Sequence, residues 1–178
     1  EYVINPTNYD GLDENFVIGA ISISAEEWDD GAYSTDWDGV SVNLFAANPV
    51  IDYTADWDSD KPDGDNEISF GDYPQENVIA VCIVWGRFGG PPSERYIEEF
   101  DIMFDINFNW GDADMLGDAV MDLQNIATHE FGHGLGLGDL YNRKTTEETM
   151  YGYSTEGEID KRDLYYGDIA GIQELYGE

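Results

Sequence analysis

The sequence predicts an α+β domain, in which helices pack on a twisted sheet. Residues 13–28 and 122–135 repeat apolar side chains at helical spacing, and β-rich segments fill the chain between them. Helices and a sheet that follow in this order bury their apolar sides against one another as layers. Because 178 residues with 42% hydrophobic content can form a core, we expect a single domain over residues 1–178.

The elements can be placed in order along the chain. Val17, Ile21, Ser24 and Trp28 recur at helical spacing behind an acidic start, which predicts an N-terminal amphipathic helix. Segments rich in β-forming residues follow or precede it, separated by Gly, Pro and Asp clusters. They predict strands at 2–4, 50–54, 67–70, 77–85 and 96–104. The periodic segment 122–135 predicts a second helix.

The charge of the chain is strongly negative. Its 39 acidic residues outnumber 7 basic ones, giving a formal net charge of −32, and the carboxylates are spread along the whole chain. Such a surface repels phosphate groups, so nucleic acid and anionic membranes are excluded as partners. We expect that salt or bound divalent cations screen this acidic shell.

Cys82 is the only cysteine, which excludes an intrachain disulfide and a cluster of thiolate zinc ligands. It lies in an apolar run and is predicted to belong to the core. No stretch approaches the roughly 18 uninterrupted apolar residues of a membrane span. The start, EYVINP, lacks the features of a signal peptide, so an exported protein would have its leader outside this chain.

The loop at 56–67 carries closely spaced carboxylates, chiefly Asp58, Asp60, Asp63, Asp65 and Glu67. Dense oxygen ligands on a flexible loop suit calcium. The spacing departs from that of an EF-hand loop, and in so acidic a chain a solvated loop is the alternative. We therefore keep both a calcium site and a solvated loop as interpretations.

Both histidines of the chain lie in the HEFGH segment of the second predicted helix. His129 and His133 step by four on the side opposite the apolar stripe, so their imidazoles project toward one point, as a metal ion requires. Glu130 could lie over the open coordination position and accept a proton from water. The alternative for such a pair is two surface histidines on a polar helix face.

Glycines follow the second histidine and predict an abrupt end of this helix. Gly136 could adopt the left-handed conformation of a sharp turn and let the chain double back. Because there is no third histidine, the remaining protein ligand must be an oxygen donor, and we expect Asp139 to supply it. A carboxylate lowers the positive charge of the site, so the metal should be lost more readily at low pH.

The segment HEFGHGLGLGD resembles the zinc-binding pattern of metzincins, in a variant with Asp as the third ligand, and its surroundings resemble matrixins. DIMFDINFNWGD and DLQNIATHEFGHGLGLG are similar to the last strand and the active-site helix of a matrixin. TMYGY resembles the Met-turn, and GDIAGIQELYG resembles the C-terminal helix. In two departures, Gly152 stands where matrixins often have proline, and Gly167 replaces an acidic residue.

The resemblance implies a zincin-like fold with a twisted five-stranded mixed sheet, an active-site helix, an N-terminal helix and a C-terminal helix. It implies one catalytic metalloprotease domain with a single catalytic zinc, secreted and monomeric, that cleaves extended protein or peptide substrates. Met150 would form the floor under the metal, Tyr151 and Tyr153 would line the pocket for the residue after the scissile bond, and Asp168 would anchor the Met-turn. The substrate would bind along an exposed strand edge at 77–85, although the continuous apolar run there is also typical of an interior strand.

Two rival interpretations remain. The first is a non-catalytic acidic module for adhesion that binds calcium and zinc, which would have no use for Glu130 and would close the fourth zinc position with a protein ligand. The second is a metallohydrolase that acts on a non-peptide substrate.

Overall fold

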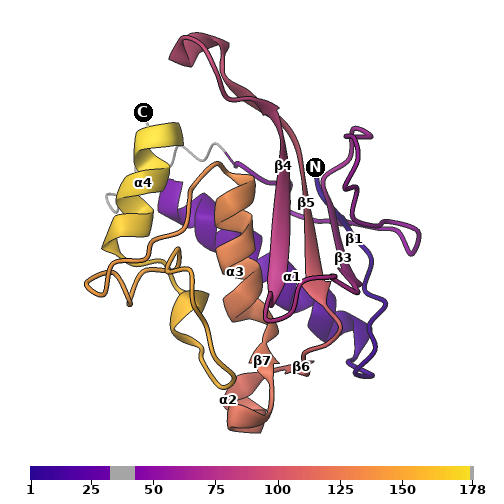
Figure 1. Cartoon of the computed structure of the whole chain (residues 1–178). Helices are drawn as coiled ribbons and strands as arrows, with labels where there is room; N and C mark the ends of the chain where they lie inside the picture. Colours follow the sequence, from indigo (N-terminus) through magenta and orange to yellow (C-terminus); the bar gives the residue numbers. More distant parts are fainter. Residues whose placement is uncertain (33–42, 177–178) are drawn as a thin grey trace.

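A mixed sheet forms one layer of the molecule, and its main helices form the other (Figure 1). The computed structural model describes residues 1–32 and 43–176. Within them the five strands lie in the order β2 (Val50–Ile51), β1 (Val3–Ile4), β3 (Glu67–Gly71), β5 (Tyr96–Asp105) and β4 (Ala80–Arg87). β2, β1, β3 and β5 are parallel, and β4 pairs antiparallel with β5. The predicted α+β class with a five-stranded mixed sheet is therefore confirmed.

The expected strands are all present, with different ends. The strand expected at 77–85 begins at Ala80, and Asn77, with a φ of 65°, lies outside the extended conformation of a strand. The strand expected at 50–54 is only two residues long, and both are exposed at the edge of the sheet. The interior alternative for 77–85 is wrong, since β4 is the last strand of the sheet within the described residues.

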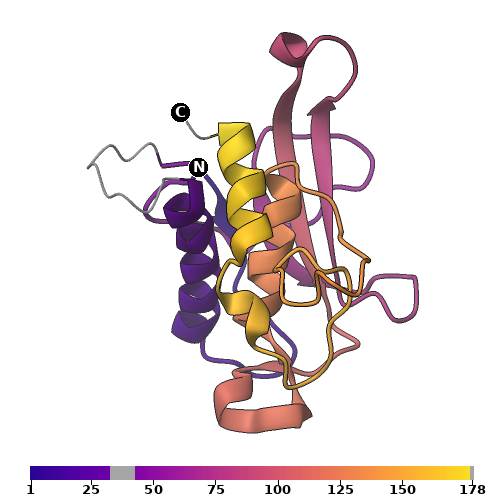
Figure 2. The ribbon, with the colours of Figure 1, turned by 90° about the vertical axis from the view of Figure 1, so that its left-hand side faces the viewer.

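Three helices carry most of the second layer, and Figure 2 shows them on one side of the strands. They are α1 (Glu14–Ala32), α3 (Leu123–Gly134) and α4 (Tyr166–Tyr176). The shorter elements are η1 (Pro92–Glu94), β6 (Trp110–Gly111), α2 (Ala113–Leu116), η2 (Gly117–Ala119), β7 (Met121–Asp122) and η3 (Asp160–Arg162). None of the helices in residues 1–32 and 43–176 has the length and apolar composition needed to cross a bilayer.

The core lies between α3, α1 and the sheet. The predicted stripes are confirmed: Val17, Ile21 and Trp28 of α1 and Leu123 and Phe131 of α3 are all 0% exposed. The indole N–H of Trp28 donates a 2.7 Å hydrogen bond to a backbone carbonyl of α3, at residue 128. This bond fixes α3 against α1, so the opposite side of α3 is presented in a defined orientation.

Cys82 in β4 is only partly buried, and it packs against the edge of this core.

Candidate metal centre and substrate cleft

Helix α3 begins and ends where its sequence requires. The Asp122 carboxylate accepts a 2.9 Å hydrogen bond from the backbone N–H of Asn125, which caps the start of the helix. At the other end Gly136 has a φ of 96°, and the N–H of Leu137 donates to the carbonyl of Gly132 at 3.0 Å. This αL termination turns the chain back toward the helix, as the glycine pattern predicted.

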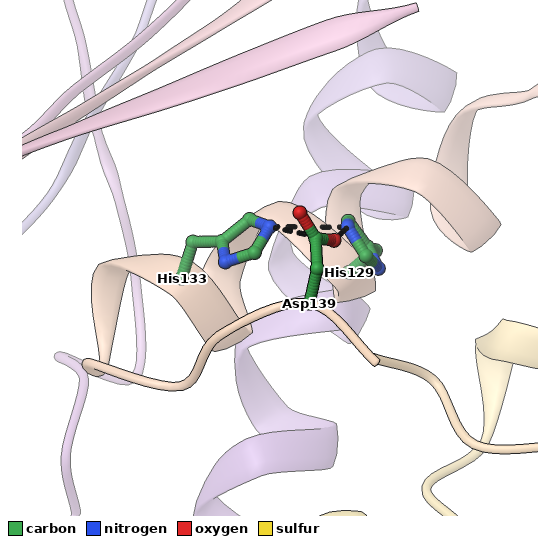
Figure 3. A group of neighbouring side chains, drawn as sticks. All are labelled: His129, His133 and Asp139. Carbon is green, nitrogen blue, oxygen red and sulfur yellow. Dashed lines mark hydrogen bonds and ion pairs between the residues drawn. The ribbon is translucent and has the colours of Figure 1, made fainter. Parts of the chain in front are cut away.

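The turn brings Asp139 to the two histidines (Figure 3). The Nε2 atoms of His129 and His133 lie 3.1 Å apart, and one oxygen of Asp139, Oδ1, is 3.3 Å from the first and 3.5 Å from the second. A tetrahedral zinc ion with bonds of about 2.0–2.1 Å keeps its ligand atoms about 3.3–3.4 Å apart. The three donor atoms therefore match the spacing and the chemistry of a zinc site.

The Nδ1 atom of each histidine is held by a hydrogen bond to a backbone carbonyl. Nδ1 of His129 is 2.7 Å from the carbonyl oxygen of Thr149, and Nδ1 of His133 is 2.9 Å from that of Leu137. A carbonyl oxygen can only accept, so each Nδ1 carries a proton, and each Nε2 is left to bind a metal or, in the metal-free protein, to take up a proton and bond Asp139. Both rings are thus held ready to bind a metal through Nε2.

Tyr141 holds the carboxylate of Asp139 from outside. Its hydroxyl donates a 2.9 Å hydrogen bond to Oδ2 of Asp139, while Oδ1 faces the histidines. The hydrogen bond from His129, assisted by the one from Tyr141, outweighs burial and lowers the pKa of Asp139 to about 2. Asp139 is therefore ionised at any pH at which the protein would bind zinc.

Glu130 lies beside this group of ligands and is 5% exposed. Among the described residues its Oε2 is buried without a hydrogen-bond partner, and the side chain lines the adjoining cavity. Burial raises its pKa above the ordinary value for a glutamate. An unsatisfied buried carboxylate with this tendency to hold a proton is typical of a catalytic group.

Met150 packs directly beneath α3. It is 2% exposed, and a Cβ added at Gly132 would come within 2.3 Å of its sulfur, so only glycine permits this close approach. The carboxylate of Asp168 accepts hydrogen bonds from the backbone N–H groups of Thr149 and Met150 at 2.6 and 3.0 Å. The expected contact between the last helix and this turn is therefore present.

A cavity of about 760 Å³ opens over the three ligand atoms. One wall is β4 with the residues preceding it, and the opposite wall is the segment 151–154. Tyr151 and Tyr153 both line it, together with Tyr141, and the ring of Tyr153 lies 5.5 Å from that of Tyr141. The cavity thus forms a cleft between an open strand edge and an aromatic wall, with Glu130 and the ligands at its base.

The acidic loop at 56–67 is assembled only in part as predicted. Asp58 and Asp63 come together with Glu99, a residue of β5 that the loop sequence gave no reason to include. Asp60, Asp65 and Glu67 lie outside this group. Asp60 and Asp65 are exposed, whereas Glu67 is buried at the start of β3. The calcium set expected from the sequence thus stays a prediction, and the structure groups only Asp58 and Asp63 of it, together with Glu99.

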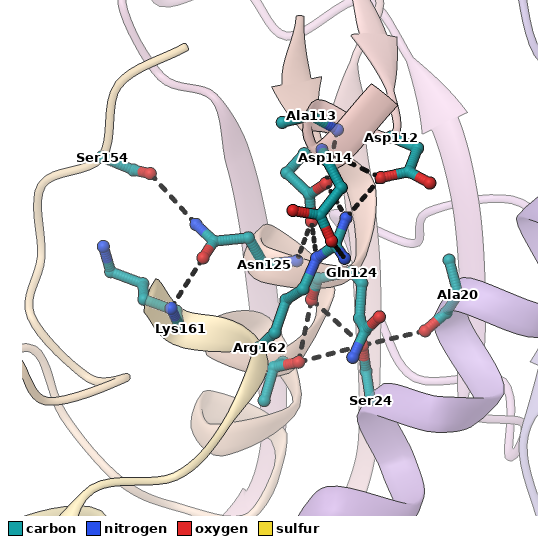
Figure 4. Close-up of polar contacts among 12 residues, drawn as sticks. Ala20, Ser24, Asp112, Ala113, Asp114, Gln124, Asn125, Ser154, Lys161 and Arg162 are labelled. Carbon is teal, nitrogen blue, oxygen red and sulfur yellow. Dashed lines mark hydrogen bonds and ion pairs between the residues drawn. The ribbon is translucent and has the colours of Figure 1, made fainter. Parts of the chain in front are cut away.

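Sequence reasoning also missed the residues that support the cleft. Asn125, Lys161 and Arg162 join the start of α3 to the segment after the Met-turn (Figure 4). One signal was available in the sequence, because Lys161 and Arg162 are adjacent basic residues in a chain with only 7 of them.

The fold matches a domain of the zincin type, and the site holds a candidate set of metal ligands. In comparisons with known proteins, a matrixin family model matches residues 24–177. The chain belongs to the matrixin family.

Three relatives illustrate the similarity. The hatching enzyme of Paracentrotus lividus is 32% identical over 142 residues, which cover 79% of this chain and 21% of the relative. Metalloendoproteinase 2-MMP of Arabidopsis thaliana is 39% identical over 92 residues, covering 49% of this chain and 22% of the relative. Matrilysin of Homo sapiens is 36% identical over 78 residues, covering 44% and 27%. The matched part of the chain spans less than a third of the length of each.

Proposed function

We propose that this chain is a zinc-dependent endopeptidase domain that hydrolyses peptide bonds of extended protein substrates. One observation carries the proposal: the three-atom ligand set lies at the base of an open cleft, beside a buried carboxylate without a partner. The name of one relative supports the same activity, since 2-MMP of Arabidopsis thaliana is a metalloendoproteinase.

His129, His133 and Asp139 would hold the zinc and leave its fourth position open to the cleft. Bound there, zinc would supply a Lewis acid that polarises the scissile carbonyl and the attacking water. A structural site would close the fourth position with a protein ligand, and within the described residues no further side chain joins these three. The open position argues against the adhesion module as the main function.

Glu130 would act as the general base and then as the general acid. Its carboxylate lines the cleft beside the ligands and would accept a proton from the attacking water. Burial raises the pKa of Glu130, so its carboxyl group would keep that proton until it is transferred to the leaving amine. No other carboxylate among the described cleft residues is free for this role, because Asp139 faces both histidines.

The substrate would bind in extended form along β4. Among the residues that the structure describes, this strand pairs with β5 on one side only, so the backbone groups of its other edge are free to bond a peptide strand. Tyr151 and Tyr153 would contact the side chain next to the scissile bond from the opposite wall.

Calcium binding would add stability outside the cleft. The group of Asp58, Asp63 and Glu99 offers three carboxylates within 4.8 Å of one another, and calcium prefers such oxygen ligands. A partly exposed site of this kind suits the high calcium concentration outside cells, in keeping with a secreted enzyme.

The proposal is tested by digesting a denatured protein substrate with the wild type and with Glu130→Gln. The zinc content of both enzymes is measured. We expect Glu130→Gln to retain zinc and to lose at least about 100-fold in rate, as removal of a general base does. The matched control is Glu174→Gln, an exposed residue of α4, which should cleave at the wild-type rate. Equal cleavage by the wild type and Glu130→Gln would end the peptidase interpretation.

A further inference from the structure

Two adjacent basic residues, Lys161 and Arg162 of η3, lie beneath the start of the active-site helix (Figure 4). The chain has only 7 basic residues against 39 acidic ones, so a pair of them next to the cleft needs an explanation. Each makes a different set of contacts, and together these contacts place a positive charge in the wall of the cleft.

Arg162 anchors η3 to α3. Its guanidinium donates to both oxygens of the buried Asp122, which caps the helix, with Nε to Oδ1 at 2.8 Å. It also pairs with Asp112 at 2.8 Å and with Asp114 at 3.0 Å. Such a bidentate pair fixes both the orientation of the guanidinium and its distance from the carboxylate. The backbone of the next residue toward the N-terminus, Lys161, is therefore held at one place relative to α3.

Asn125 completes the anchor from the first turn of α3. Its side-chain oxygen accepts a 2.7 Å hydrogen bond from the backbone N–H of Lys161, and its amide nitrogen donates to the hydroxyl of Ser154 at 3.3 Å. Asn125 is 0% exposed, so these bonds are protected from water. Lys161 and the cleft wall at 154 are thus built on the same helix as the metal ligands.

The side chain of Lys161 is 3% exposed and yet lines the cleft, as Ile126 and Ser154 also do. Its ammonium donates to the carbonyl of Tyr153 at 3.0 Å and to the carboxylate of Glu158. An ammonium has three N–H donors, and within the described residues only these two acceptors are bonded. One donor is left for a group that enters the cleft.

Lys161 is also the one lysine or arginine among the described residues that line this cleft. The other charged groups there, Glu130 and Asp139, have roles at the metal. A side chain that enters between α3 and the segment 151–154 therefore meets an ammonium at the wall formed by Ile126, Ser154 and Lys161.

We propose that Lys161 is a specificity-determining residue, which selects substrates with a carboxylate side chain, chiefly glutamate, on a residue that flanks the scissile bond. This inference rests on the proposed endopeptidase function. A substrate carboxylate would take the remaining donor of the ammonium in a charge-assisted hydrogen bond. Glu158 competes for the same ammonium, so it sets how strong the preference becomes.

The test uses zinc-loaded protein and a peptide whose cleavage site has been mapped by mass spectrometry. Three versions of it carry Glu, Gln or Leu at the flanking position that the mapping shows to be selective, and kcat/KM is measured for each. We expect the wild type to favour Glu over Gln by about 10-fold or more, the effect of a hydrogen bond to a charged group. Glutamine keeps the size and shape of glutamate, so the ratio reports the charge alone.

Two variants connect this ratio to Lys161. Lys161→Met keeps the length of the side chain and should bring the Glu/Gln ratio close to 1. Glu158→Gln removes the competing carboxylate from outside the cleft lining and should raise the ratio above that of the wild type. A purely structural Lys161 would instead change all three peptides by the same factor.

A Glu/Gln ratio near 1 in the wild type, or an unchanged ratio in Lys161→Met, would overturn the inference while the endopeptidase function stands. If Lys161→Met does not fold, Glu158→Gln decides, and a ratio no higher than that of the wild type overturns the inference. Failure of the zinc-loaded wild type to cleave any peptide would overturn the proposed function, and this inference with it.

Discussion

The ion pair between Arg162 and Asp122 should be the most important one for stability. Asp122 is 0% exposed at its side chain and Arg162 is 19% exposed, so removal of the guanidinium leaves a carboxylate buried without its counter-charge. Breaking a buried pair in this way costs about 3–5 kcal/mol. We expect the lower end of this range for Arg162→Met, because Asp122 keeps hydrogen bonds from the backbone N–H groups of Ala113 and Asn125, both at 2.9 Å.

The other partners of Arg162 add little to this estimate. Asp112 and Asp114 are 30% and 58% exposed, and exposed pairs contribute about 0–1 kcal/mol each. A loss of about 3 kcal/mol lowers the melting temperature of a domain of this size by roughly 6–12 °C, at about 2–4 °C per kcal/mol. Thermal and urea unfolding of the zinc-free protein, followed by circular dichroism, measure both quantities.

The chain offers a matched control for this experiment. Arg87 pairs with Glu94 at the tip of the β4–β5 hairpin, where the two side chains are 54% and 49% exposed. Arg87→Met should therefore cost less than about 1 kcal/mol. If Arg162→Met and Arg87→Met unfold within about 1 kcal/mol of each other, the assignment of a buried anchor at Arg162 is refuted.

Three further predictions concern the metal site, the helix packing and pH. Tyr141→Phe should weaken zinc binding about 10-fold, measured in competition with a chelator, because the Tyr141 hydroxyl orients the carboxylate of Asp139. The control Tyr153→Phe, at an exposed ring, should leave the zinc affinity unchanged. Equal zinc affinities of the two variants would contradict this prediction. Gly132→Ala should lower the free energy of unfolding by about 1–3 kcal/mol, because the added Cβ would lie 2.3 Å from the buried sulfur of Met150. The control Gly19→Ala, with open space around the added Cβ, should not destabilise the protein. Burial raises the pKa of Glu67 to about 7, so the folded protein holds a proton that the unfolded chain has released by about pH 5. The free energy of unfolding in EDTA should therefore fall as pH rises from about 5 to 7, and Glu67→Gln should make this fall shallower; an equal slope in the variant would count against it.

The parts of the site that could be predicted are those that local geometry determines. His129, Glu130 and His133 follow from helical spacing alone, and Asp139 follows from the glycine turn and the lack of a third histidine. Glu99 could not be found in this way. It comes from a strand more than 30 residues after the loop it joins, and only the register of β5 beside β3 brings it there.

The same contrast applies to the fold. The central strand β5 was predicted well because its second half is rich in β-forming apolar residues, Phe100, Ile102, Met103 and Phe104, which are buried in the core. β2 was predicted too long, since an exposed edge strand has no core to fix its end. The basic pair of Lys161 and Arg162 is visible in the sequence, but the role of Lys161 is not, because its position depends on Asn125, which lies 36 residues earlier in the chain.

The open edge of β4 has a consequence for solution behaviour. An unpaired strand edge is a template for any other strand, including the same edge of a second copy, and proteins commonly protect such edges from aggregation. Arg87 is the one charged residue of β4, so local charges do little to prevent its edge from pairing with other strands. Protection of this edge must come from the charge of the whole molecule. A net charge of −32 repels like copies while leaving a neutral peptide free to approach. The acidity of this chain thus keeps the β4 edge from pairing with other copies, and near the isoelectric point of about 4.1 that protection disappears.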